Sequence, residues 1–136
     1  YFLVKLLEKN GLKYGDVQSV FLAPADARAA FEKGAVDAWI IWDPFLASAQ
    51  KTLGARILAD ATGVVNNRAY YFSSRDFASR HPEVLRIAVE EINAQFGTAP
   101  VTREILAEQQ AIADAFFDLK LIPKKLNLLH AAPVGL

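Results

Sequence analysis

The chain has 136 residues, and its 15 basic and 15 acidic side chains cancel to a formal net charge of zero. Hydrophobic residues make up 53% and charged residues 22%, which indicates a folded globular protein and not a disordered one. A neutral chain without a basic stripe argues against nucleic-acid binding, and no apolar run reaches the roughly 20 residues of a membrane span. Cysteine is absent, which excludes disulfides and thiol chemistry.

Helical and strand-like patterns alternate along the first 60 residues. Apolar residues recur at helical spacing in three segments, each closed by a glycine (Gly11, Gly34 and Gly54) that suits the left-handed position after a helix. The expected helices are 1–10, 25–33 and 43–54, and the expected strands are 19–22, 35–41 and 56–59. This alternation predicts an α/β fold with a mostly parallel sheet covered by helices.

The second half of the chain is predicted to hold one more strand and then helices. His81 precedes Pro82, and a residue before proline disfavours helix, so we expect a break there. Thr102 is expected to cap a long helix that ends near Leu119. The expected segments are a strand at 69–73, helices at 76–79, 82–95 and 102–119, a loop at 96–101 and an irregular tail.

Residues that could perform catalysis are few. His81 and His130 have no serine or carboxylate at a spacing typical of a triad, and no HExxH, Walker-type or GxGxxG motif occurs. Asp37 and Asp43 lie six residues apart on different predicted elements, so we do not expect them to converge as an acid–base pair. Arg68 is interpreted as an exposed turn residue, with an anion-binding role as the alternative. We therefore expect neither an enzyme, nor a metal, nor a cofactor.

Both tryptophans of the chain, Trp39 and Trp42, lie between a predicted strand and the start of the next predicted helix. In open α/β sheets, ligands bind beyond the carboxyl ends of strands, next to helix N-termini whose N–H groups favour anions. Tryptophan adds an apolar wall with one N–H donor, which suits a small solute with an alkyl body and an oxyanion head. The residues alone leave two interpretations open: a ligand site, or core tryptophans followed by Asp43 as a helix cap.

The run 22–45, LAPADARAAFEKGAVDAWIIWDPF, resembles the periplasmic aliphatic-sulfonate-binding proteins of ABC importers, which are relatives of the taurine- and nitrate-binding proteins. Further similar stretches lie at 54–58, 70–75, 81–84, 109–117 and 121–125. The resemblance implies a two-lobed, type II periplasmic-binding-protein-like fold that binds its ligand in the cleft and closes by hinge motion. It also implies capture of an alkanesulfonate, delivery to a membrane permease for sulfur uptake, and no catalysis.

Carried onto this sequence, the resemblance places Trp42, Trp39 and Asp43 in the stretch that faces the cleft. Asp37 belongs to the same motif, with a role in the fold as the alternative. The implied setting is the periplasm, or a lipid anchor outside the cytoplasmic membrane, for a monomer that binds a small anion and an ABC permease. Alternatives are taurine, nitrate or a thiamine-precursor pyrimidine as the solute, and a pyrimidine-synthesis enzyme or a ligand-sensing regulatory domain of the same fold.

The family is longer than this chain, so the resemblance implies an incomplete fold that begins at an interior cut. Residues 1–64 correspond to part of the second α/β lobe, and 65–136 to the crossover back to the first lobe plus C-terminal helices. Relatives carry a further helical stretch where Gln95 and Phe96 adjoin here. We therefore expect missing sequence at the 95/96 junction.

Overall fold

The computed structural model describes residues 1–131, and the chain divides into two compact units, Tyr1–Asn67 and Arg68–Leu136. The first unit contains α1 (Phe2–Lys9), the 3-10 helix η1 (Tyr14–Asp16), α2 (Pro24–Glu32) and α3 (Phe45–Leu53). The second contains α4 (Arg75–Arg80), α5 (Pro82–Phe96), α6 (Arg103–Asp118) and the 3-10 helix η2 (Leu128–Ala131).

The helix ends in the first unit follow the glycine pattern of the sequence. Gly11 has φ 73°, its N–H donates to the Glu8 carbonyl oxygen (3.0 Å), and the Leu12 N–H donates to the Leu7 carbonyl oxygen (2.9 Å). These two bonds form a Schellman motif, which satisfies carbonyls that the end of α1 would otherwise leave unpaired. Gly54 ends α3 in the same left-handed region, with φ 63°.

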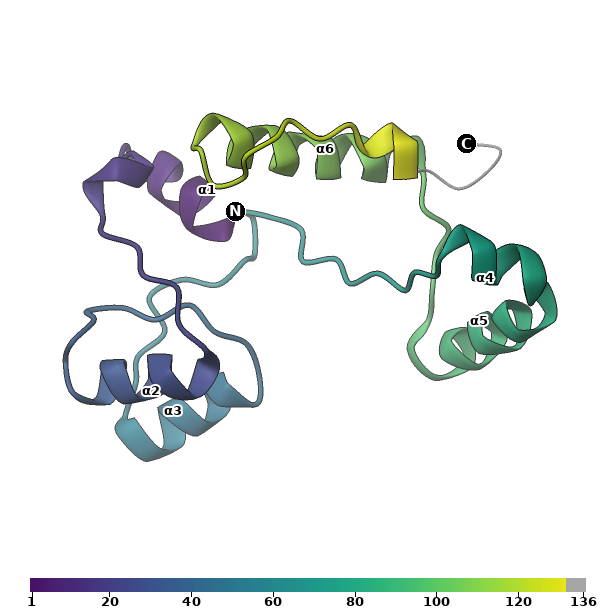
Figure 1. The fold of residues 1–136 in the computed structure, drawn as a ribbon. Coiled ribbons are helices and arrows are strands. Elements are labelled where there is room, and N and C mark those ends of the chain that lie inside the picture. Colours follow the sequence, from purple (N-terminus) through teal and green to yellow (C-terminus); the bar gives the residue numbers. More distant parts are fainter. Residues whose placement is uncertain (132–136) are drawn as a thin grey trace. The chain divides into compact units, whose positions relative to one another are not determined.

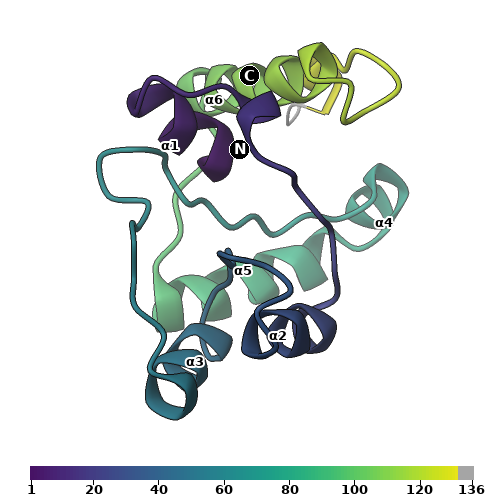
Figure 2. The same cartoon turned by 90° about the vertical axis from the view of Figure 1, so that its left-hand side faces the viewer.

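Helices α2 and α3 lie side by side in the first unit (Figures 1 and 2). Ala27 of α2 and Ala49 of α3 are buried, and Ala49 is only 2% exposed. The polar contacts that join α2 to α3 are described with the candidate site.

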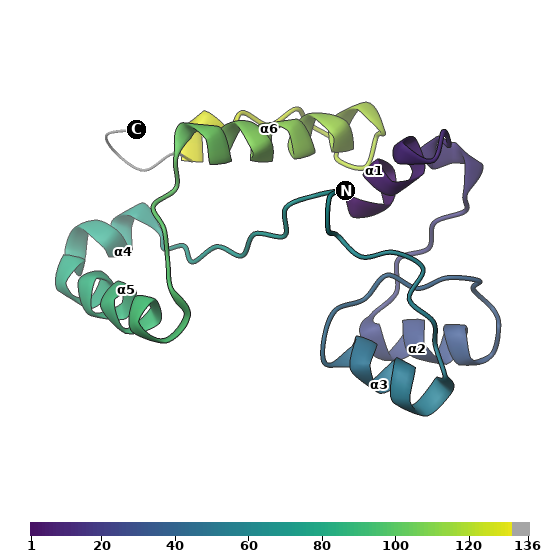
Figure 3. The same cartoon turned by 180° about the vertical axis from the view of Figure 1, so that it is seen from behind.

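In the second unit, α4 and α5 pack together and meet at the break that His81 and Pro82 predict (Figure 3). The Ser74 hydroxyl caps α4 by accepting the Phe77 N–H (3.1 Å). Thr102 caps α6 as expected, since its hydroxyl accepts the Ile105 N–H (3.4 Å). The segment after α6 returns along that helix and ends in η2.

The four predicted strands are wrong as regular elements, because residues 1–131 contain no strand. Segments 19–22, 35–41, 56–59 and 69–73 are irregular and carry no hydrogen-bonded ladder. A strand requires a neighbouring strand to pair with, and no backbone hydrogen bond joins one of these segments to another among the described residues. Large side chains of the apolar runs therefore stay exposed: Phe21 (81%), Leu58 (72%) and Phe72 (95%).

The buried apolar residues are few for the described length: Val4, Leu7, Ala27, Ala49, Leu106 and Ala113. Three of these six are alanines, so little side-chain volume is removed from water. None of the described helices has the length and apolar character needed to cross a membrane.

Candidate functional site

The two tryptophans of the motif have different surroundings. Trp39 is half-buried, and its ring lies 6.1 Å from the ring of Phe31 on α2, at 40°. Trp42 is 63% exposed and meets the ring of Phe45, the first residue of α3, edge-on at 6.3 Å and 88°. Edge-to-face contact is a favoured geometry for aromatic pairs. Trp39 thus packs on its own preceding helix, while most of the Trp42 surface stays accessible.

Three N–H groups in the first turn of α3 have acceptors. The Leu46 N–H donates to the Trp42 carbonyl oxygen (3.2 Å), and the Ser48 N–H donates to the Pro44 carbonyl oxygen (3.1 Å). Between them, the Ala47 N–H donates to Asp43 Oδ1 (3.1 Å). The exposed carboxylate of Asp43, one residue before the N-cap residue Pro44, therefore accepts an N–H of the first turn of α3. It also places a negative charge where an anion would otherwise be attracted.

Asp37 is exposed at a bend between α2 and the tryptophans. It is the member of the predicted site that lies farthest along the chain from α3. The Asp43 carboxylate accepts a hydrogen bond from the first turn of α3, whereas Asp37 lies in the bend before the tryptophans.

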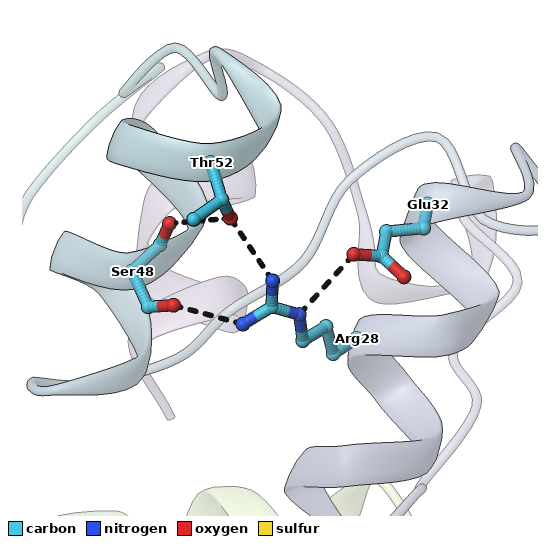
Figure 4. Close-up of polar contacts among 4 residues, drawn as sticks. All are labelled: Arg28, Glu32, Ser48 and Thr52. Carbon is cyan, nitrogen blue, oxygen red and sulfur yellow. Dashed lines mark hydrogen bonds and ion pairs between the residues drawn. The ribbon is translucent and has the colours of Figure 1, made fainter.

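Arg28 joins α2 to α3 and is a residue that the sequence interpretation did not single out (Figure 4). Its Nη1 donates to Ser48 Oγ (2.8 Å), its Nη2 donates to Thr52 Oγ1 (2.9 Å), and its Nε donates to Glu32 Oε1 (3.3 Å). Ser48 and Thr52 stand one turn apart, so they share a face of α3. That spacing, opposite an arginine on the neighbouring helix, is the pattern that could have pointed to this contact.

Arg68 is engaged in an ion pair within the second unit. Its Nε and Nη2 donate to the two carboxylate oxygens of Glu108 at 2.9 and 3.1 Å, a bidentate geometry. The hydrogen bond to Glu108 raises the pKa of Arg68. The guanidinium is thus already occupied by a carboxylate, which weakens the alternative that Arg68 binds a solute anion.

The two histidines make different local contacts. Nδ1 of His81 lies 3.9 Å from a carboxylate oxygen of Glu83, and its ring packs at 4.9 Å from that of Phe77. The His130 carbonyl oxygen accepts a hydrogen bond from Arg75 (2.8 Å). Across residues 1–131, no three histidine or acidic side chains are grouped in a way that could hold a metal ion.

A groove of about 500 Å³ lies between α6 and the segment that follows it. None of the four predicted site residues lines it. Gln110, one of its polar lining residues, donates to the Leu126 carbonyl oxygen and accepts the Leu128 N–H, both at 2.9 Å. Asp114 lies 3.7 Å from the Lys125 ammonium. These contacts hold the segment on α6.

The sequence matches one protein-family model over residues 1–116, described as the substrate-binding domain of the ABC-type glycine betaine transport system. The chain belongs to this family of ABC-transporter substrate-binding domains. Solved structures agree with this assignment. The crystal structure of the periplasmic aliphatic sulphonate-binding protein from Escherichia coli superimposes with a TM-score of 0.73 at 30% identity, over 94% of this chain and 56% of that one.

Curated relatives are binding proteins of the same kind. An aliphatic sulfonates-binding protein of Escherichia coli (strain K12) is 30% identical over 165 residues, covering 93% of this chain and 50% of that protein. A second aliphatic sulfonates-binding protein, from Bacillus subtilis (strain 168), is 33% identical, and the alignment covers 82% of this chain and 32% of that protein. The taurine-binding periplasmic protein of Escherichia coli (strain K12) is 32% identical, and the alignment covers 70% of this chain and 31% of that protein. The chain thus spans half or less of the length of these relatives.

These matches confirm both the family resemblance and the fold class. The substrate-binding domain has the periplasmic-binding-protein fold, of which this chain holds a part. The chain follows the path of that fold although its described residues form no sheet ladder. The first alignment runs over 165 residues and the chain has 136, so some residues of the Escherichia coli protein have no counterpart here.

Proposed function

We propose that the chain is part of the solute-binding component of an ABC importer that captures aliphatic sulfonates and delivers them to a membrane permease for sulfur uptake. Similarity to two aliphatic sulfonates-binding proteins, at 30% and 33% identity, is the observation that carries the proposal. The solved relative at 30% identity has a related name and the same fold. These relatives are named as binding proteins, which supports a role in binding without catalysis.

Trp42 is the residue that we propose to contact the solute. It is exposed, aromatic and fixed at the start of α3 by the hydrogen bond between its carbonyl and Leu46. An alkyl chain lying against this ring would bury apolar surface that water now covers, which stabilises the complex. Sulfate has no alkyl part and requires hydrogen-bond donors on all sides, so the same surface disfavours it.

The sulfonate oxygens need hydrogen-bond donors, and three N–H groups in the first turn of α3 are already engaged. The N–H groups of Leu46, Ala47 and Ser48 are engaged, and Asp43 adds a negative charge beside them. We therefore propose that the oxygens are bound chiefly by the part of the fold that this chain does not cover. In this proposal Trp39 supports the Trp42 wall, Asp43 holds the helix start, and Asp37 serves the same loop.

Taurine is the second candidate solute. The taurine-binding relative is 32% identical over 100 residues, close to the values for the sulfonate-binding relatives. Taurine carries an ammonium group as well as the sulfonate, and the exposed Asp43 carboxylate next to Trp42 could pair with that ammonium. A comparison of taurine with simple alkanesulfonates decides between these solutes.

The remaining organisation follows the resemblance. We propose that 1–64 belong to the second lobe and 65–136 to the return to the first lobe, outside the cytoplasmic membrane. We also propose that the residues of the Escherichia coli protein that have no counterpart in this chain fall at the junction of Gln95 and Phe96. Helix α5 runs unbroken through this junction, from Pro82 to Phe96. A helix that spans the junction is compatible with removal of an intervening helical stretch.

The test is a titration of the full-length binding protein with ethanesulfonate, taurine, sulfate and nitrate, followed by tryptophan fluorescence. We expect saturable binding of a sulfonate at micromolar concentration, about −8 kcal/mol. Trp42→Ala should weaken this binding, whereas Phe77→Ala, which removes a partly exposed ring of α4 outside the motif, should leave it unchanged. Saturable binding of nitrate alone would overturn the sulfonate assignment.

A further inference from the structure

Arg28 is placed to control where the Trp42 segment stands. Helices α2 and α3 form an interface, and each has a single buried residue, Ala27 or Ala49, whose alanine side chain is too small to fix the rotation of one helix about its axis. Arg28 reaches across this interface with two hydrogen bonds, to Ser48 and Thr52 (Figure 4). Because the two acceptors lie one turn apart on α3, the contact sets both the distance and the rotation of α3 against α2.

The orientation of the guanidinium is itself fixed. On its own helix, Glu32 accepts from Nε of Arg28 at 3.3 Å, one turn further along α2. On α3, the Thr52 hydroxyl donates its hydrogen to the Ser48 carbonyl oxygen (2.8 Å), which leaves its lone pairs to accept from Arg28. A planar guanidinium can satisfy these three acceptors at once, and a lysine ammonium, a single point charge, cannot.

Movement of α3 reaches Trp42 directly. The Leu46 N–H donates to the Trp42 carbonyl oxygen and the Ala47 N–H to Asp43 Oδ1, so the Trp42–Asp43 segment is hydrogen-bonded to the first turn of α3. The Trp42 ring also packs on Phe45 of the same turn. The segment and the helix therefore move together.

We infer that Arg28 is a positioning residue for solute binding: by holding α3 against α2, it sets the orientation of Trp42. The predicted effect on sulfonate affinity rests on the proposed function. The control of the Trp42 orientation by Arg28 is independent of that function. Ser48 and Thr52 take part in this positioning as the acceptors of the Arg28 hydrogen bonds.

The experiment uses the full-length binding protein and two readouts. The first is the affinity for ethanesulfonate by calorimetry, well below the unfolding temperature of each variant. The second is the indole N–H signal of Trp42 in the ligand-free ¹H–¹⁵N spectrum, assigned with Trp42→Phe. The variants are Arg28→Gln, Arg28→Lys and Thr52→Val. Thr52→Val keeps the arginine and the side-chain volume at position 52, so it tests the same contact if Arg28→Gln does not fold. Arg86→Gln is the control, because it removes an arginine paired with Glu90 one turn away (2.7 Å) without touching α3.

We expect Arg28→Gln to weaken ethanesulfonate binding about tenfold, within the range of coupling between distant groups. Arg28→Lys and Thr52→Val should give smaller losses, all three should shift the Trp42 indole signal, and Arg86→Gln should do neither. An unchanged Trp42 signal in Arg28→Gln and Thr52→Val overturns the inference, even where thermal stability falls. A shifted signal with no sulfonate binding by the unmutated protein supports the positioning role and refutes the proposed function alone.

Discussion

Asp43 offers a perturbation that separates a structural role from a role in binding. Its Oδ1 accepts the Ala47 N–H at 3.1 Å, a bond to the first turn of α3 like that of a capping side chain, although Asp43 stands one residue before the N-cap residue Pro44. Loss of such a cap in an Asp→Ala change costs about 1 kcal/mol, and the favourable interaction of a carboxylate with the helix dipole adds about 0.5 kcal/mol. Asparagine keeps the oxygen acceptor and loses only the charge. We therefore expect Asp43→Ala to lower the free energy of unfolding by about 1.5 kcal/mol and Asp43→Asn by about 0.5 kcal/mol.

Urea unfolding of the full-length protein measures this difference through the transition midpoint at constant slope. Asp37→Ala is the matched control, since it removes an exposed carboxylate of the same motif, and we expect a change within about 0.5 kcal/mol. If Asp43 only caps α3, Asp43→Asn leaves sulfonate affinity unchanged or strengthens it, because a negative charge near the solute is removed. Equal destabilisation by Asn and Ala would contradict the cap, and a large loss of affinity in Asp43→Asn would contradict a purely structural role.

Two further changes test local features of the fold. Gly54 has φ 63° and open space where a Cβ would stand, so Gly54→Ala should lower the free energy of unfolding by about 1 kcal/mol through backbone strain alone. Gly15 is equally open and has no positive φ, so Gly15→Ala should change that free energy by no more than about 0.5 kcal/mol in urea unfolding, and equal effects of the two changes would refute the strain. A hydrogen bond to Thr102 lowers the pKa of Glu104 below 4.5, so its stabilising contribution is present above pH 4.5 and lost as the pH falls through the lowered pKa. Thr102→Val should raise the pKa of Glu104 in an NMR titration, and an unchanged pKa would refute the assigned cause.

The helices could be predicted from the sequence because their determinants are local. Gly11 and Gly54 end helices at positive φ, Thr102 and Ser74 sit at helix starts, and Pro82 begins α5 after the break at His81. Each of these effects acts within a few residues. They therefore operate in a chain that holds only part of its fold.

The strands could not be predicted with the same success because pairing is not local. The segments containing Phe21, Leu58 and Phe72 have apolar patterns typical of buried strands, yet these side chains are 72–95% exposed. Their pattern indicates that they are made to be covered, and pairing depends on residues distant in sequence. The structural match to a protein of which this chain covers 56% agrees with that interpretation.

The candidate site shows the same division. The importance of the Trp39–Asp43 stretch could be seen in the sequence, because both tryptophans and a helix start coincide there. The different exposures of Trp39 and Trp42 depend on packing against Phe31 and Phe45, which spacing alone does not give. Arg28 was missed because its acceptors lie on another helix, 20 and 24 residues away in sequence.

The central claim is that the solute is an aliphatic sulfonate held partly by apolar contact. Calorimetric titration of the full-length protein with ethanesulfonate and, separately, with sulfate tests it most directly, because the two anions differ in the alkyl group that Trp42 is proposed to cover. We expect saturable binding of ethanesulfonate with a negative heat-capacity change, the mark of apolar burial, and much weaker binding of sulfate. Binding of sulfate as tight as that of ethanesulfonate, or no heat with either anion, would contradict the claim.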